Sequence, residues 1–227
     1  MFVILRLEFN PSPQPSPAGE GEYFLSLMPY EVEKRSKLSD QMEFDRVKNY
    51  LEGQAEFLGR KEMKSFLFRT PTFLRIRLVR GDDKVLITEK TGEYTEAGRL
   101  ETEYKIPLET LPEFVNKKAK EGYQSCSLVH TTRNSYLLNG LKVELNTIDH
   151  LGLIIEIEAL TENETEVPSL ESEIGKTMVE LQLKELDPKK YQEMMTAMYS
   201  ETLKPVSEHD FRILASDKFY GRMEGKL

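Results

Sequence analysis

The feature of this sequence that most constrains its fold is a set of short segments in which charged and apolar residues alternate. Successive side chains of a β-strand point to opposite faces, so charges at positions i and i+2 share one face. Arg75 and Arg77 alternate with Leu and Ile in one such segment, and Glu156 and Glu158 alternate with Ile in another. The pattern therefore predicts strands that have one apolar face and one charged face.

Further charged positions of this kind occur in four other segments: Glu31, Glu33 and Arg35; Lys90; Arg99, Glu101 and Glu103; and Arg133. Strands are expected at 29–37, 56–69, 73–80, 84–91, 98–106, 124–138, 141–148 and 152–161. The Asn139-Gly140 dipeptide between two of these segments is a strong hairpin signal. Most neighbouring strands are therefore expected to pair antiparallel.

Two interpretations of the charged faces are open. In the simpler one, each charged face lies in water, as is usual for one face of an antiparallel sheet. Solvent faces, however, mix polar residue types, whereas here acidic pairs and basic pairs are found on different strands. The alternative is an α+β fold in which a closed eight-stranded antiparallel β-barrel has helices packed outside. In that fold the apolar faces meet the helices, and glutamates and arginines line the lumen.

Helices are expected between and after the strands. Ser39 can cap a helix on which Met42, Phe44, Val47 and Leu51 roughly share one face. A second helix follows Pro107 and stops near Gly122. Residues 167–204 read as two helices that separate at Asp187-Pro188.

The chain divides into three parts on composition. Residues 1–28 form a Pro/Gly-rich N-terminal extension that is expected to be disordered, because residues 10–22 lack apolar periodicity. Met28 is a hypothetical native start, which would make residues 1–27 an upstream extension of the reading frame. Residues 29–205 form the barrel domain, and residues 206–227 form a C-terminal tail.

Composition excludes several classes of function. Hydrophobic residues make up 39% and charged residues 31%, and no apolar run is long enough to cross a bilayer, so no membrane role is expected. The formal charge of −8 argues against a broad nucleic-acid-binding surface. Cys126 is the single cysteine, which excludes an internal disulfide and a thiolate-rich zinc site and fits a cytoplasmic location. Exposed helices and a barrel edge are compatible with a homodimer.

A lumen lined with both carboxylates and guanidiniums predicts a ligand that combines a cation with an anion. Crowded carboxylates raise one another's pKa, so a divalent metal would relieve them, and a polyanion would relieve the arginines. Carboxylate oxygens are ligands that Mg²⁺ or Mn²⁺ prefers, and arginine donates bidentately to phosphate. The expected partner is therefore a metal-bound small molecule that contains phosphates.

The motifs together resemble the CYTH superfamily of triphosphate tunnel enzymes. Glu31-Val32-Glu33-Lys34-Arg35 resembles the family's ExExK signature, and Leu74-Arg75-Ile76-Arg77 resembles its LRIR strand. The remaining motifs are similar in the same order: Ile87-Thr88-Glu89-Lys90 to LTxK, Arg99 to Glu103 to RxExE, and Leu151 to Glu158 to LGxFIEIE. The resemblance covers about residues 30–205, and the combination is more specific than any single motif.

The resemblance implies a role for each matching residue. Metal ligands would be Glu31, Glu33, Glu156 and Glu158, and further acidic positions in the lumen would be Glu101 and Glu103. Phosphate-binding residues would be Arg35, Arg75, Arg77, Lys90 and Arg133, and catalytic residues would be Glu156, Glu158 and Arg35. Three positions depart from the family pattern: Arg35 replaces a lysine, Thr131 replaces a basic residue and Asn146 replaces an aspartate. Arg for Lys keeps the charge but changes the geometry of phosphate contact.

Three functions remain open from the sequence. The first is metal-dependent hydrolysis of an inorganic, thiamine or nucleoside triphosphate. The second is the adenylyl cyclase reaction, in which ATP gives cAMP and pyrophosphate. The third is non-catalytic binding of polyphosphate or a nucleotide, which the three departures keep open.

Overall fold

The protein combines one large, mostly antiparallel sheet with four α-helices, as the α+β prediction requires. The computed structural model describes residues 3–8, 30–95 and 98–205. Its strands are β1 (Val3–Glu8), β2 (Tyr30–Lys37), β3 (Glu56–Phe68), β4 (Phe73–Val79), β5 (Lys84–Thr95), β6 (Gly98–Pro107), β7 (Ser125–Leu138), β8 (Leu141–Ile148), β9 (Gly152–Thr161) and β10 (Leu203–Pro205). Its helices are α1 (Gln41–Gln54), α2 (Leu111–Lys120), α3 (Val167–Glu180) and α4 (Pro188–Thr202). Short 3₁₀ turns, η1 (Leu108–Thr110) and η2 (Glu164–Glu166), precede α2 and α3.

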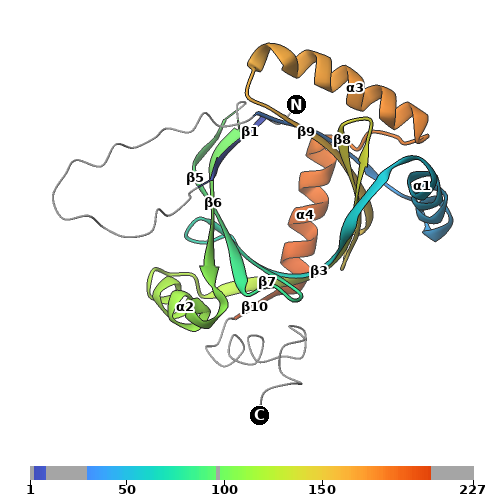
Figure 1. The fold of residues 1–227 in the computed structure, drawn as a ribbon. Helices are drawn as coiled ribbons and strands as arrows, with labels where there is room; N and C mark the ends of the chain where they lie inside the picture. Colours follow the sequence, from blue (N-terminus) through green and yellow to red (C-terminus); the bar gives the residue numbers. More distant parts are fainter. Residues whose placement is uncertain (1–2, 9–29, 96–97, 206–227) are drawn as a thin grey trace.

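The strands form a single ten-stranded sheet in the order β10-β7-β3-β4-β5-β6-β1-β2-β9-β8, and β7 also pairs with β8. The sheet curves around a common centre, which Figure 1 shows in end view. The hairpin between β7 and β8 turns at Asn139 (φ 52°) and Gly140 (φ 82°). Positive φ at both central residues is what a type I′ hairpin needs, so the Asn-Gly prediction is confirmed.

Three expectations about the fold need correction. The sheet has ten strands rather than eight, and β1 pairs parallel with β6, so it is not wholly antiparallel. Residues 3–8, placed in a disordered extension, form β1 between β2 and β6. Their short apolar run supplies a strand, because the neighbouring edges of β2 and β6 offer backbone groups that need partners. The rest of residues 1–28, and the tail at 206–227, lie outside the described residues.

Helix α1 begins one residue later than predicted. Asp40, not Ser39, is the N-cap, and its side chain accepts a hydrogen bond from the backbone N–H of Glu43. Ser39, the residue before the cap, donates its own N–H to the Glu43 carboxylate at 2.8 Å, so the Glu43 side chain ties down the chain that enters the helix. Met42 is 78% exposed, so it does not join the buried face that Phe44 forms with its neighbours.

Two apolar clusters cover the outer face of the sheet. Helices α1 and α3 pack over β2, β8 and β9, where Val32, Ile155 and Ile157 are buried. Helix α2 packs over β3, β4 and β5, where Leu74 and Ile76 are buried. Residues that alternate with these buried ones must point to the opposite, inner face.

Helix α4 packs differently from the other three. Its Met198 and Tyr199 form a third cluster with Leu67 of β3 and Val129 of β7. Leu67 lies opposite Arg75 in the β3–β4 register and alternates with Phe66 and Phe68 of the outer cluster. Helix α4 therefore covers part of the inner face, where it crosses the ring of strands in Figure 1.

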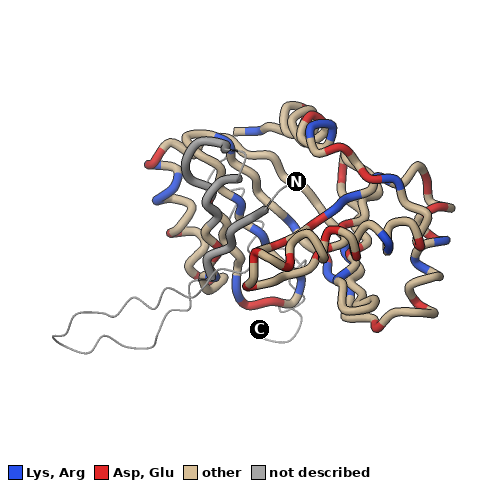
Figure 2. Tube along the Cα trace, turned by 90° about the horizontal axis from the view of Figure 1, so that it is seen from above, with Lys and Arg blue, Asp and Glu red and all other residues tan. Residues whose placement is uncertain are grey.

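Charged residues of both signs lie along the strands as well as on the helices (Figure 2). Among the described residues, no helix combines the length and the apolar character that crossing a membrane would need. The charged residues of the strands lie outside the two outer apolar clusters, and those on the inner face form the candidate site.

Candidate functional site

The inner face of the sheet carries the charged residues that the alternation singles out. Val32 is buried under the outer helices, so Glu31, Glu33 and Arg35 of β2 point inward. The same argument places Arg75 and Arg77 of β4 inward, because Leu74 and Ile76 are buried outside. It also places Glu156 and Glu158 of β9 inward, because Ile155 and Ile157 are buried outside. The apolar side chains of each strand thus pack under the outer helices and fix the position of the strand. Its charged side chains, on the inner face, are available to bind a ligand.

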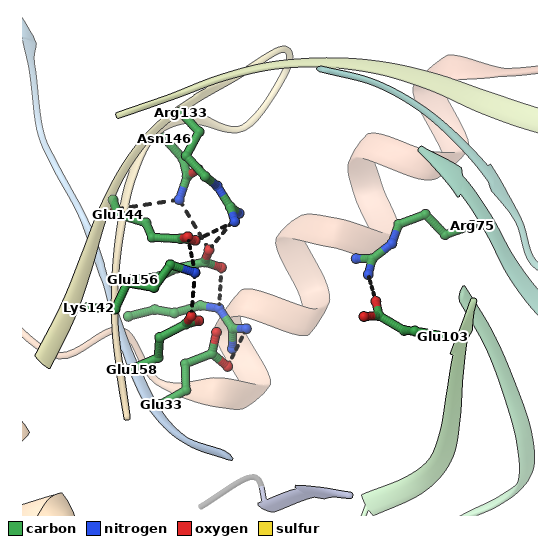
Figure 3. A network of polar contacts seen from close by, with 10 residues as sticks. Glu33, Arg75, Glu103, Arg133, Lys142, Glu144, Asn146, Glu156 and Glu158 are labelled. Carbon is green, nitrogen blue, oxygen red and sulfur yellow. Dashed lines mark hydrogen bonds and ion pairs between the residues drawn. The ribbon is translucent and has the colours of Figure 1, made fainter. Parts of the chain in front are cut away.

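A network of two arginines around Glu156 forms the centre of one wall (Figure 3). Arg35 Nε donates to Glu156 Oε1 at 2.9 Å, and Arg133 lies 3.2 Å from Glu156 Oε2. Asn146 donates to the same carboxylate at 3.1 Å and accepts from Arg133 Nε at 2.8 Å. Burial alone would raise the pKa of Glu156, but the guanidiniums of Arg35 and Arg133 outweigh it and lower that pKa. Glu156 is therefore a buried, ionised anchor for both arginines.

Two residues of β8 extend this network, and the sequence interpretation missed both. Lys142 Nζ lies 2.5 Å from Glu144 and 2.6 Å from Glu158. Glu144 is 1% exposed and also pairs with Arg133. Lys142 and Glu144 show the same i, i+2 alternation as the other strands. The two residues have opposite signs, so they did not fit the pattern of acidic or basic pairs.

Three carboxylates beside this network can hold a metal ion. One oxygen from each of Glu31, Glu33 and Glu158 lies within 4.8 Å of the other two. Ligands of a common divalent cation at about 2.0 to 2.6 Å must lie within roughly that separation. Glu156 belongs to the arginine network rather than to this group, although the sequence analysis expected it among the metal ligands. Strand alternation predicts the face of a residue but not its partner.

Glu33 has the most strongly perturbed carboxylate in this group. Burial raises its pKa to about 8, Arg35 opposes that rise, and the nearby carboxylates of Glu156, Glu31 and Glu158 add to it. The Arg35 guanidinium lies 2.5 Å from Glu33 Oε1, yet this buried oxygen has no aligned hydrogen-bond donor within the described part of the chain. A hard divalent cation would satisfy this oxygen and neutralise the crowded charges, so the donor set fits Mg²⁺ or Mn²⁺.

The second wall of the site contains two arginines on β4. Arg75 donates to Thr88 at 3.0 Å. It also donates to the buried Glu103 at 3.1 Å, as Figure 3 shows. Arg77 differs, because its buried Nε has no hydrogen-bond partner among the residues that the structure describes. Burial, Arg75 and Arg133 together lower the pKa of Arg77 to about 9. Arg77 is therefore still charged at neutral pH, and it forms no ion pair with the side chains that the structure describes.

Helix α4 adds an aromatic residue to the site. The Tyr191 ring lies 4.6 Å from the Arg35 guanidinium, a cation–π distance. The backbone N–H of Leu186, which precedes α4, donates to the Arg35 carbonyl at 2.7 Å. A cavity of about 190 Å³ is lined by Glu33, Arg35, Leu186 and Tyr191 among others. Sequence periodicity could not place Tyr191 here, because it depends on how a distant helix docks.

The remaining predicted residues are placed less completely. Lys90 of β5 and Glu101 of β6 face each other in the strand register, but their side chains and that of Arg99 lie outside the described part of the structure. Glu103 is 5% exposed and pairs with Arg75. Thr131 lies on the inner face of β7, two residues from Arg133, as its alternation predicts.

The arrangement has a clear chemical capacity. One wall offers carboxylate oxygens for a hard cation, and the opposite wall offers guanidinium donors, among them the Arg77 Nε that has no hydrogen-bond partner in the described part of the chain. Arginine forks match the geometry of phosphate oxygens, and a metal ion commonly bridges such oxygens. The site can therefore bind an anion and a divalent cation side by side.

The comparisons with known proteins agree with this arrangement. Residues 29–191 match the CYTH domain, whereas a comparison with curated protein sequences found no match. Among solved structures, the PH1819 protein from Pyrococcus horikoshii OT3 is 23% identical with a TM-score of 0.60, over 74% of this chain and 99% of that one. A candidate adenylate cyclase from Vibrio parahaemolyticus is 17% identical with a TM-score of 0.57, over 73% of this chain and 97% of that one.

A third solved structure is that of a candidate adenylyl cyclase from Hippeastrum with a dominant triphosphatase activity. It is 16% identical to this chain with a TM-score of 0.51, over 75% of this chain and 96% of that one. Identities this low show a shared fold. Because the domain match extends over most of the sequence, the chain belongs to the CYTH domain family.

Proposed function

We propose that the protein is a divalent-metal-dependent phosphohydrolase that acts on a triphosphate bound between the two charged walls. The observation that carries this proposal is the pairing of a carboxylate triad, Glu31, Glu33 and Glu158, with a buried guanidinium, Arg77, whose Nε has no hydrogen-bond partner among the described residues. The triphosphatase activity of the Hippeastrum relative supports it. We further propose that the sheet closes into a tunnel, because β7 pairs with both β3 and β8.

In the proposed complex the arginines of both walls bind the phosphate chain. Arg77 and Arg75 donate to its oxygens from β4, while Arg133 and Arg35 approach from β7 and β2. Glu156 holds the last two guanidiniums 2.9 and 3.2 Å from its own oxygens, so their donors are oriented before the substrate arrives. This preorganised charge is what phosphoryl transfer requires, since it needs positioning more than a strong nucleophile.

The metal ligands would be Glu31, Glu33 and Glu158. A divalent cation held there would neutralise phosphate charge and lower the pKa of a bound water. Glu158 is itself oriented by Lys142 at 2.6 Å, and the raised pKa of Glu33 reflects a carboxylate that gains from a nearby positive charge. These residues would orient a water for in-line attack on the terminal phosphorus, while Arg35, held in place by Glu156, would bind the phosphate.

One experiment separates the three functions. Purified protein is incubated with tripolyphosphate, thiamine triphosphate or ATP, with Mg²⁺, with Mn²⁺, or with a chelator. Metal-dependent release of orthophosphate is the expected result. Formation of cAMP and pyrophosphate from ATP would instead establish a cyclase, and thermal stabilisation by tripolyphosphate without turnover would establish a binding module. If no ligand is turned over or stabilises the protein, the proposed site is wrong.

A further inference from the structure

The wall formed by strands β3 to β6 carries three lysines that the proposed triphosphate site does not use. Lys61 lies on β3, Lys84 on β5 and Lys105 on β6. All three side chains are exposed. None of them forms an ion pair or a side-chain hydrogen bond with the residues whose side chains the structure describes. We call these three residues the lysine collar.

The register places the collar on the same face as Arg77. Leu86 of β5 lies opposite both Arg77 and Lys105, and directly opposed residues of antiparallel strands point to one face. Lys84 is two residues from Leu86, so it shares that face. Val85 and Ile87, which alternate with Lys84 and Leu86, belong to the apolar cluster under α2 on the outer face. Lys84 and Leu86 therefore point to the inner face.

Lys61 is placed inward by the same reasoning on β3. It lies opposite Arg133 in the β3–β7 register, and Phe66 and Phe68 take the outer positions of its strand. Six residues separate Lys61 from Leu67, where α4 packs, a distance of about 20 Å along a strand. The collar therefore lies at the end of this wall that is farther from α4, beyond Arg77.

The outer faces of these strands provide a comparison. Arg80 and Arg60 both pair with Glu62, at 2.7 and 3.3 Å, and Lys118 of α2 pairs with Glu89 of β5 at 3.2 Å. Cations on the outside of the wall are thus neutralised by carboxylates. Unlike Lys142 on the opposite wall, the three collar lysines form no ion pair among the described side chains, which favours an anionic ligand that approaches from within.

We propose that the lysine collar is a second anion-binding site, which holds the part of a linear polyphosphate chain that extends beyond the three phosphates bound at the arginines. This inference rests on the proposed function and names its substrate class: a chain longer than tripolyphosphate, bound by its end. The flexible ammonium group of lysine can bind phosphate oxygens in many orientations, as the repeating part of such a chain requires. The planar guanidinium of arginine binds two oxygens in a fixed geometry, as the reacting end requires.

A nucleic acid fits this wall less well than polyphosphate. Single-stranded nucleic acids are bound by basic grooves with aromatic side chains on which bases stack. Among the described inner-face residues near the collar, Met63, Ser65, Val79 and Leu86 offer no aromatic ring. The wall thus provides positive charge but no aromatic ring on which a base could stack, and a polyphosphate chain, which has no bases, needs only the charge.

The test uses a triple variant with glutamine at Lys61, Lys84 and Lys105. A matched control replaces Lys117, Lys120 and Lys176 by glutamine, because these lysines are exposed on the outer helices and the change in net charge is the same. Each protein is given tripolyphosphate or a size-selected linear polyphosphate several times longer, with Mg²⁺. Orthophosphate release gives KM, and calorimetry gives Kd at several salt concentrations.

In the unaltered protein, long-chain polyphosphate should bind more tightly than tripolyphosphate and with a steeper dependence on salt. The collar variant should lose about tenfold in long-chain affinity, as three exposed charge contacts predict, while its tripolyphosphate Kd changes less than about twofold. The control variant should resemble the unaltered protein.

Equal loss in the collar and control variants would overturn the proposal, as would equal affinity of the unaltered protein for both chain lengths. An oligonucleotide of equal charge that binds as tightly as polyphosphate would also contradict it, because the site would then be a general polyanion surface. Failure of tripolyphosphate turnover in the unaltered protein would refute the proposed hydrolysis instead. Selective loss of long-chain binding in the collar variant would still support the collar in that case.

Discussion

Replacing Arg77 by methionine should stabilise the ligand-free protein and weaken triphosphate binding. Burial, Arg75 and Arg133 lower the pKa of Arg77 to about 9, from an ordinary arginine value of about 12.5. At about 1.36 kcal/mol for each tenfold change in the equilibrium, this fall corresponds to an upper limit of about 5 kcal/mol. Relaxation and residual hydration reduce it, so we expect a gain of about 1 to 3 kcal/mol in the free energy of unfolding.

Replacing the neighbouring Arg75 by methionine is a matched variant that should lower, rather than raise, the free energy of unfolding of the ligand-free protein. Arg75 donates to Glu103, which is 5% exposed, so methionine at Arg75 removes a cation that stabilises this buried carboxylate. Losing one partner of such a pair should cost about 1 to 3 kcal/mol. Both variants should weaken tripolyphosphate binding, because each removes a guanidinium from the same wall.

Thermal unfolding with and without tripolyphosphate and Mg²⁺ measures both effects. A domain of this size shifts its Tm by about 2 to 4 °C for each kcal/mol. The Arg77 variant should melt above the unaltered protein without ligand and the Arg75 variant below it, and both should gain less stability from tripolyphosphate than the unaltered protein does. If Arg77→Met lowers Tm as much as Arg75→Met, Arg77 is satisfied in the free protein and the reasoning fails.

Three further predictions test other parts of the site. Glu156→Gln should lower kcat/KM for tripolyphosphate at least tenfold while circular dichroism stays unchanged, because it frees both arginines; Glu173→Gln on the exposed face of α3 is the control. Lys142→Met should weaken Mn²⁺ binding in calorimetry about tenfold, since Lys142 orients Glu158 at 2.6 Å, and unchanged Mn²⁺ affinity would count against that role. Tyr191→Leu should raise the KM about two- to tenfold whereas Tyr191→Phe keeps it, because only the ring contacts Arg35; equal KM in both variants would exclude the cation–π contact.

The bounds of most strands could be predicted closely, because apolar residues recur at every second position along them. The segments expected at 141–148 and 152–161 coincide with β8 and β9, and the other strands from β2 to β7 begin within one residue of their expected starts. Strands β1 and β10 were missed for different reasons. The short apolar run of β1 precedes a Pro-rich segment, and β10 has three residues, too few to show alternation. Closure of the barrel stays a prediction.

The face of each site residue could also be predicted, but its partners could not. Alternation placed Glu156 inward, and only the register shows that Arg35 lies opposite it and Glu144 on its other side. That register makes Glu156 an anchor for arginines, while Glu31, Glu33 and Glu158 form the carboxylate triad. Tyr191 and Leu186 reach the site from a different element, through docking of α4 and the segment before it. Such long-range contacts leave no signal in the spacing of a single strand.

The central claim is that metal and phosphate bind side by side between the two inner walls. A crystal of the protein with Mn²⁺ and a slowly hydrolysed triphosphate analogue tests it through the anomalous signal of manganese. We expect one manganese peak within about 2.0 to 2.4 Å of oxygens from Glu31, Glu33 and Glu158, with phosphate oxygens in contact with Arg77. Manganese at another place, or phosphate bound on the outer face with Arg77 Nε still without a partner, would contradict the account.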